Sequence, residues 1–306
     1  MDSRNFQELL EFQWSFNNHV CLGLDSEYSR IPESLRRRSI QNTLIAFNQG
    51  IVDATKDAVC AYKLNLAFYL KYGSEGITAL RETVANIRAV AREIPTILDG
   101  KHGDTVDSNV AYALAAFESF NMDAVTVNPY AGMEPLQPFF DHPDKGVIIL
   151  CHTSNKGANF LQDKTVSLSL QERKDFFPRP IDSQNWEHDV PDCLPVYQYV
   201  GYHVSRHWNK NGNCVLSAGA TYPADIAKIR RIDDDMPLLI LGNGTQGGDI
   251  EKTVTFGKSS RGLRMIVNFS RSIIFASQGS DCFEAARNKT IDLGDTINQY
   301  RLNNLH

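Results

Sequence analysis

The chain has 306 residues, 42% of them hydrophobic and 22% charged, which is the composition of an ordinary globular protein. A net charge of −5 without long Lys/Arg runs excludes the basic surface that nucleic-acid binding needs. No apolar run reaches the ~18 residues of a membrane span.

Short, β-rich apolar runs alternate along the chain with segments of helical periodicity. The runs are 19–26, 58–65, 94–100, 124–130, 146–154, 213–221, 238–244 and 265–271, and the helical segments include 38–55, 76–94, 108–120 and a closing helix within 281–304. Such alternation predicts βαβ units with a parallel sheet. Eight repeats at this length predict an α/β fold of the closed (β/α)₈ TIM-barrel type, as one domain over 1–306. An open doubly wound sheet is the alternative.

One connection is much longer than a usual βα loop. It covers residues 155–195 and follows the fifth predicted strand. On a barrel this insert would lie at the mouth, where it would act as a lid or rim. A surface excursion without a catalytic role explains it equally well, so both interpretations stay open.

The cysteines and the N-terminus indicate the compartment. None of the six cysteines forms a C-x-x-C pair, and the eight histidines show no ligand spacing. This pattern favours buried, reduced thiols over disulfides or a zinc site, and we expect no metal site. Charges stand in the first residues where a signal peptide would be apolar. These features predict a cytoplasmic protein.

Each predicted strand ends in groups able to bind a ligand or to do chemistry. In a barrel these ends converge on one mouth, where active sites are built. A single polar loop residue usually just faces water, but polar ends on so many strands together predict an enzyme. The residues are Asp25, Lys63, Asn65, Asp99, Lys101, Asn128, Thr153, Ser154, Asn155, Thr221, Ser270 and Arg271, with Asn65 and Asn128 as candidates for substrate binding.

A glycine loop follows the seventh predicted strand. Gly242, Gly244 and Gly247 have the G-x-G-x-x-G spacing, which alone suggests a dinucleotide fold. However, the loop does not follow the first strand, and the next strand ends in Asn268 and Arg271, without an acid to bind ribose. Barrels often bind phosphate after strands seven and eight. We therefore expect a phosphate site in which backbone N–H groups and Arg271 contact the oxygens.

The stretch "ILDGKHGD" (97–104) places a charge cluster at the third strand end. Asp99 and Lys101 are two apart on an extended segment, so both side chains should point into the mouth. Lys63 ends the neighbouring strand, and Asp104 follows after a short turn. Together they would form an alternating Lys–Asp–Lys–Asp array, in which each charge stabilises its neighbours. Such an array is either catalytic or a structural ion-pair network.

At these residues the sequence resembles the orotidine 5′-phosphate decarboxylase family, in particular its subfamily with the T-x-N-P-Y motif. The motifs span nearly the whole chain: "GLD" (23–25), "YKLNLAFY" (62–69), "DGKHGD" (99–104), "TVNPYAG" (126–132), "HTSNKGA" (152–158), "GATYP" (219–223), "GNGTQGG" (242–248) and "SR" (270–271). Related sugar-phosphate enzymes share the D-x-K-x-x-D element, whereas the T-S-N and Q-G-G elements are more specific to the orotidylate enzymes.

The resemblance implies the chemistry. Lys101 would protonate C6 of the pyrimidine as carbon dioxide leaves, and Asp99 would lie against the substrate carboxylate. Lys63 and Asp104 would complete the charge array. The family uses neither metal nor cofactor, so a preorganised cation must stabilise the developing carbanion.

The resemblance also implies the binding residues and the partner. Asp25 and Lys63 would bind ribose hydroxyls, and Ser154 would hydrogen-bond to the pyrimidine edge. Gln246 and Arg271 would grip the phosphate beside the loop glycines. Family members are homodimers, so Asp104 and Ser108 would act in the partner's site. The expected partners are thus a nucleotide substrate and a second copy of the chain.

Several positions depart from the family pattern. Gly100, His102, Thr105 and Ser108 replace Ala, Arg, Ile and Thr, and Leu241, Asn243 and Thr245 alter the phosphate loop. The charged residues are all present, so the leading hypothesis is decarboxylation of orotidine 5′-phosphate. Two alternatives remain. One is a metal-dependent sugar-phosphate decarboxylase or aldolase, and the other is a repurposed paralogue that binds a pyrimidine nucleotide without turnover.

Overall fold

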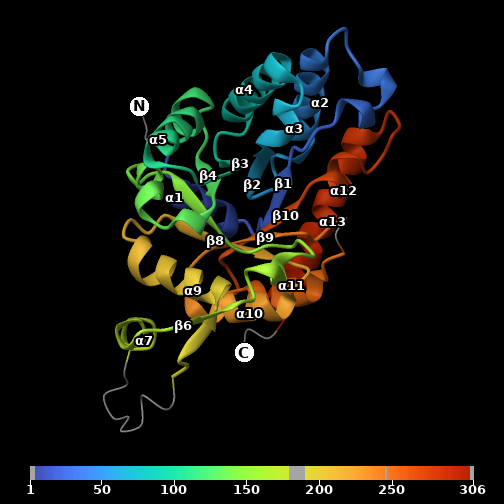
Figure 1. Ribbon diagram of the computed structural model, residues 1–306. Coiled ribbons are helices and arrows are strands. Elements are labelled where there is room, and N and C mark those ends of the chain that lie inside the picture. Colours follow the sequence, from blue (N-terminus) through green and yellow to red (C-terminus); the bar gives the residue numbers. More distant parts are fainter. Residues whose placement is uncertain (1–3, 179–189, 245–246, 304–306) are drawn as a thin grey trace.

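The computed structural model describes residues 4–178, 190–244 and 247–303, and in them eight parallel strands form a closed barrel (Figure 1). The strand order is β1-β10-β9-β8-β5-β4-β3-β2. The strands are β1 (Val20–Gly23), β2 (Ala61–Asn65), β3 (Thr96–His102), β4 (Ala124–Val127), β5 (Gly146–His152), β8 (Cys214–Gly219), β9 (Leu238–Leu241) and β10 (Met265–Phe269). Each of the eight predicted runs overlaps one barrel strand. The predicted (β/α)₈ barrel is confirmed, and the open sheet is wrong.

Helices surround the barrel on the outside (Figure 1). They are α1 (Phe6–Ser15), α2 (Ile40–Thr55), α3 (Leu66–Leu70), α4 (Gly73–Val90), α5 (Val106–Leu114), α6 (Gln137–Phe140), α7 (Leu170–Phe176), α9 (Val196–His203), α10 (Pro223–Ile232), α11 (Ile250–Gly257), α12 (Arg271–Ile274) and α13 (Cys282–Leu302). Short 3₁₀ turns cover Tyr28–Arg30, Glu33–Leu35, Pro129–Ala131, Glu134–Leu136 and Ala158–Phe160, and π-turns cover Ala115–Ser119 and Val204–Trp208.

The helices begin and pack as their sequences dictate. Ser39 caps α2, because its side-chain oxygen accepts a hydrogen bond from Asn42 N. Leu44, Phe47 and Ile51 then recur at helical spacing and are buried. The predicted helix over 108–120 differs most, since α5 starts at Val106 and ends at Leu114, where the π-turn continues it.

Helix α1, which the sequence analysis did not predict, closes the inner end of the barrel. Phe6, Leu10 and Trp14 of α1 form one buried cluster with the first axis-facing residue of each strand. Those residues are Cys21, Ala61, Ile97, Ala124, Ile148, Val215, Leu239 and Ile266. Because side chains alternate along a strand, the next axis-facing position lies two residues further on, toward the mouth. The apolar layer therefore forms a floor beneath the candidate site.

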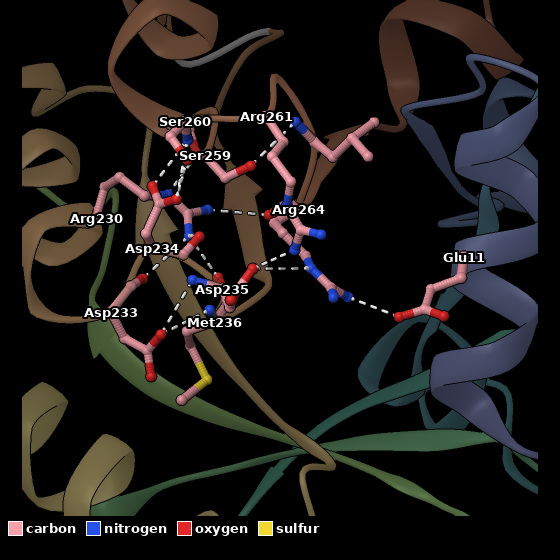
Figure 2. A network of polar contacts seen from close by, with 12 residues as sticks. Glu11, Arg230, Asp233, Asp234, Asp235, Met236, Ser259, Ser260, Arg261 and Arg264 are labelled. Atoms are coloured by element: carbon pink, nitrogen blue, oxygen red, sulfur yellow. Dashed lines mark hydrogen bonds and ion pairs between the residues drawn. The ribbon is translucent and has the colours of Figure 1, made fainter.

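A polar network fastens the loops near this inner end (Figure 2). The Arg230 guanidinium is buried and donates hydrogen bonds to backbone carbonyl oxygens, including those of Gly257, Met236 and Arg264. Arg264 bonds in turn to Glu11 of α1 at 3.0 Å (Figure 2). Arg230 thereby satisfies carbonyl oxygens at the end of α11 and in the loops before β9 and β10, and Arg264 O also accepts from Leu238 N. The network thus joins the loops before β9 and β10 to α1.

The long insert is partly ordered into secondary structure. In its described residues, β6 (Thr165–Ser167) pairs antiparallel with β7 (Cys193–Pro195), and α7 lies between them in sequence. Residues 179–189 of the predicted insert lie outside the described residues. Figure 1 shows β6 and α7 at the periphery, beside α9 and α10. A role as lid stays a prediction.

Two predictions about composition can be compared with the structure. All six cysteines are free, and five are buried, whereas Cys193 is exposed. In the described parts of the chain, no helix is long and apolar enough to cross a membrane.

We predict that His19 makes stability pH-dependent. Burial, reinforced by Arg301, lowers the pKa of His19 to about 4, against an ordinary 6.5. The neutral ring is favoured in the fold, so its stabilisation is complete above pH 6.5 and is lost as the pH falls towards 4. Urea unfolding of the wild type should show a loss of about 2 kcal/mol between pH 7 and pH 5 from this group. His19→Gln should be less pH-dependent by that amount, and equal pH slopes for the two proteins would contradict the prediction.

Candidate active site

The axis-facing positions above the apolar floor are mostly polar. They are Gly23, Lys63, Asp99, Thr126, Leu150, Ser217, Leu241 and Asn268, each two residues beyond a floor residue. Five of them also line the pocket at the mouth: Lys63, Asp99, Leu150, Leu241 and Asn268. The axis-facing side chains therefore change from apolar to mostly polar within two residues along each strand. This change marks the boundary between the apolar floor and the candidate site.

Four charged side chains alternate in sign at the bottom of the pocket. Lys63 Nζ lies 3.8 Å from Asp25 Oδ1 and 3.2 Å from Asp99 Oδ2. Asp99 Oδ1 lies 2.5 Å from Lys101 Nζ. Asp25, Lys63 and Asp99 are buried, whereas the Lys101 side chain is 44% exposed. Within one chain the charge array is thus Asp25–Lys63–Asp99–Lys101, and the expected contribution of Asp104 to a partner's array stays a prediction.

Each buried charge is stabilised by its neighbours. Burial would lower the pKa of Lys63, but the Asp25 and Asp99 carboxylates outweigh burial and raise that pKa above its ordinary value. Burial likewise opposes the ionised form of Asp99, and Lys63 and Lys101 outweigh it, so that the pKa of Asp99 falls to about 2. The array is therefore fully charged at neutral pH.

The backbone at Lys101 is not extended as the sequence analysis assumed. Lys101 has φ +52°, a left-handed conformation that non-glycine residues rarely adopt, and the pairing of β3 with β4 shifts between Leu98 and His102. This bulge turns Lys101 so that its ammonium returns to Asp99. The predicted contact is present, but the reason given for it is wrong.

Thr126 supports this turn from the neighbouring strand. Its hydroxyl donates to Asp99 Oδ1 at 3.0 Å and accepts from Lys101 N at 2.9 Å. One buried side chain thereby orients both the carboxylate and the backbone of the lysine. The sequence analysis missed this role, although Thr126 stands two residues before Asn128 on the same strand, where alternation points it at the axis.

Most of the predicted site residues lie around the same pocket. Those that line it are Asp25, Lys63, Asn65, Asp99, Lys101, Ser154, Gly242, Gly244 and Arg271. Asp104, Ser108, Asn128 and Gly247 are described but do not line it, and Gln246 lies outside the described residues. The polar strand ends Thr153, Asn155 and Ser270, which were also expected at the mouth, line it as well, and the structure adds Phe68, Leu150, Leu241, Asn268, Phe269 and Ser272.

Two predicted asparagines have local structural partners. Asn65 Oδ1 accepts from Ala67 N and caps α3, although Asn65 also lines the pocket. Asn128 Oδ1 accepts from Tyr130 N, is exposed, and stabilises its own turn. Asn128 therefore does not line the pocket within one chain, and its role in substrate binding stays a prediction.

The glycine loop has the shape that its sequence predicts. Gly242 and Gly247 have φ values of +93° and +83°, which favour glycine. Gly248 N donates to Gly242 O, and this bond closes the loop. Asn243 turns back and donates to Ile240 O at 3.2 Å. This departure from the family pattern thus contacts strand β9 and not the pocket.

Comparisons with known proteins agree with this geometry. A sequence model described as "Orotidine 5′-phosphate decarboxylase / HUMPS family" matches residues 18–285. The chain belongs to this family.

Curated relatives and solved structures match nearly the whole chain. An orotidine 5′-phosphate decarboxylase of Ralstonia nicotianae is 41% identical over 297 residues, covering 97% of this chain and 99% of the relative. One from Cellvibrio japonicus is 38% identical over 298 residues, with 97% and 99% covered. The structure of Leishmania donovani OMP decarboxylase superposes with a TM-score of 0.76 at 30% identity, covering 97% of this chain and 99% of that one.

Two departures from the family pattern explain each other. A Cβ atom on Gly100 would lie 2.3 Å from His102 Nε2, so the histidine ring occupies the space that an alanine methyl would need. The ring is held there by stacking on Tyr112, with centroids 4.1 Å apart. Gly100 and His102 flank Lys101 and therefore set the position of its bulge.

We predict strong coupling between these two positions. Gly100→Ala alone should destabilise the protein by about 1–3 kcal/mol, because the new methyl group overlaps the His102 ring. In a His102→Ala background the same change should cost little, since the overlapping ring is absent. Urea unfolding of the wild type, both single variants and the double variant would measure the coupling. Additive effects of the two substitutions would contradict the prediction.

Proposed function

We propose that the protein is an orotidine 5′-phosphate decarboxylase that converts orotidine 5′-phosphate into uridine 5′-phosphate and carbon dioxide. The observation that carries the proposal is the alternating array Asp25–Lys63–Asp99–Lys101 at the bottom of a pocket whose rim holds a glycine loop and Arg271. The family and its relatives support the same reaction.

Lys101 is the proton donor in this mechanism. When the bond between C6 and the carboxylate carbon breaks, its electron pair stays on C6 and carbon dioxide leaves. The Lys101 ammonium stabilises that negative charge and then transfers a proton to C6, and solvent reprotonates the amine. Lys101 is the partly exposed cation of the array, and Asp99 holds it at 2.5 Å. A cation fixed before the reaction needs no reorganisation as charge develops.

The far end of the nucleotide supplies binding energy. The glycine loop and Arg271 line the pocket with Ser154 and Asp25, so phosphate, base and sugar each have a wall in one cavity. Contacts to the phosphate do not change during decarboxylation, but they hold C6 against Lys101. Gln246 is proposed to assist at the phosphate by resemblance to the family.

A homodimer and a cytoplasmic location are parts of the same proposal. Asp104 is exposed, and its Oδ1 accepts from the neighbouring Thr105 N. Ser108 receives a hydrogen bond from Thr105 at 3.2 Å. Asp104 directly precedes the N-cap of α5 and Ser108 lies in its first turn, and we propose that both reach the site of a second copy. The six free cysteines support a reducing compartment.

The two alternative functions are less well supported. The two pocket carboxylates, Asp25 and Asp99, are close to lysine ammonium groups, which compete with a metal ion for their oxygens. Of the two departures that suggested a repurposed paralogue, Asn243 contacts its own strand, and Thr105 hydrogen-bonds to Asp104 and Ser108 of its own chain. Neither change removes a charge from the array.

We predict that Lys101→Ala abolishes decarboxylation. Turnover, followed as loss of orotate absorbance, should fall by at least about 10³-fold, because one residue supplies both the preorganised cation and the proton. Lys210→Ala, which removes an exposed lysine of a loop between α9 and β8, should match the wild type. Lack of turnover by the wild type would overturn the proposed function, and a Lys101→Ala rate within tenfold of the wild type would overturn the role of Lys101.

We also predict complementation between subunits. Lys101→Ala and Asp104→Ala chains should each be inactive alone, but denatured together and refolded as a mixture they should recover activity. A mixed dimer has one site with Lys101 from one chain and Asp104 from the other, so random pairing restores about a quarter of the sites. A mixture as inactive as its components would show that Asp104 acts within its own chain.

A further inference from the structure

Asn268 on β10 is a buried polar side chain without a complete set of partners. It is 8% exposed and lines the pocket. Its Nδ2 donates to Ser270 Oγ at 3.4 Å, and its Oδ1 has no hydrogen-bond partner among the described residues. A buried amide oxygen that lost water on folding and gained no donor is destabilising. The fold itself therefore gives no reason for an amide at this position.

The strand position between Asn268 and Lys63 carries no side chain. Cys21 of β1 lies opposite Asn268 in register, and Gly23 lies opposite Lys63 on the next strand. A Cβ on Gly23 would lie 2.0 Å from Ser270 Oγ, so glycine is required there because the serine hydroxyl occupies the space. Asn268 and Lys63 thus face the pocket on either side of a strand position without a side chain.

The unpaired atoms on this wall are hydrogen-bond acceptors. Asp25 Oδ1 is buried and lies 3.8 Å from Lys63, beyond hydrogen-bond distance, and it too has no donor among the described residues. Asn268 Oδ1 adds a second such acceptor to the same pocket. Two acceptors complement a ligand that offers donors. A phosphate offers only oxygens, and its loop lies on the other side of Asn268, on β9.

We propose that Asn268 is a further substrate-binding residue, whose Oδ1 accepts a hydrogen bond from a ribose hydroxyl of the nucleotide. The sugar is the part of a nucleoside monophosphate that carries hydroxyl donors, and it lies between base and phosphate, as Asn268 lies between the Asp25–Lys63 pair and the glycine loop. The ribose hydroxyl then donates the hydrogen bond that Asn268 Oδ1 does not receive from the described residues. This inference rests on the proposed function for the identity of the ligand.

Binding of uridine 5′-monophosphate by calorimetry tests the inference without requiring turnover. Asn268→Leu, of similar size, should bind this nucleotide about tenfold more weakly, because one hydrogen bond is lost. It should also melt at the same or a higher temperature, because an unpaired polar group has been removed from a buried site. A residue with a merely structural role would show the opposite pattern.

Asn213 provides a matched control. It is also buried, and its Oδ1 likewise has no partner among the described residues, but it does not line the pocket. It lies next to β8 at the inner end, and its Nδ2 donates to His142 O and Lys145 O. Asn213→Ala should lower the melting temperature and leave the affinity for uridine 5′-monophosphate unchanged.

Deoxynucleotides identify the contact. Removing the hydroxyl that Asn268 binds, 2′ or 3′, should lower the affinity of the wild type by about tenfold. Asn268→Leu and the wild type should then bind that deoxy analogue equally well, because the contact is absent in both. Unchanged affinity of Asn268→Leu for the ribonucleotide would overturn the proposal. So would an Asn268→Leu variant that loses as much affinity as the wild type loses when either hydroxyl is removed from the nucleotide. If the wild type binds uridine 5′-monophosphate but releases no carbon dioxide, the proposed function fails while the role of Asn268 is still decided by these affinities.

Discussion

The contact between Lys63 and Asp99 is the constraint on which the site depends. Both groups are buried, and either one alone would lose far more hydration than the fold could replace. They remain charged because Asp25 and Lys101 extend the pair into an array in which every charge has an opposite neighbour. Replacing one member leaves its partner buried and uncompensated. The array is thus a single unit, and the barrel must place the ends of three strands, β1, β2 and β3, within a few ångströms to build it.

That requirement explains how the barrel is divided along its axis. The inner end is filled by apolar residues and closed by α1, and the carbonyl cage around Arg230 fixes the loops there. Because the candidate site lies at the other end, the residues here can be packed and hydrogen-bonded for stability alone. The mouth contains local backbone strain, because Lys101 has a left-handed conformation. The Thr126 hydroxyl supports that conformation through its hydrogen bonds to Lys101 N and Asp99 Oδ1. A rigid inner end is what makes a strained outer end tolerable.

The sequence predicted features that repeat or that have composition signals. Alternation of runs and helical segments predicted the barrel, and glycine spacing predicted the loop at Gly242, because backbone conformations with positive φ demand glycine. Prediction from the sequence failed where the backbone geometry depends on a single residue. Nothing in "DGKHGD" indicates that Lys101, rather than a glycine, adopts the left-handed conformation. The place of Asp25 in the array was missed because it depends on the distance between side chains of neighbouring strands, and α1 was missed because it packs on residues from all eight strands.

Two buried polar groups of the pocket wall lack partners that a structural group such as Arg230 has. Arg230 is buried and bonded to several carbonyls, so its charge is satisfied by the fold itself. Asp25 and Asn268 are as well buried, yet each keeps an oxygen without a donor, and both face the pocket. Natural folds leave few such atoms. Because a ligand with hydroxyl donors removes this cost only when it binds, the cost becomes part of the driving force for binding, and a wall that is unfavourable when empty selects for a sugar.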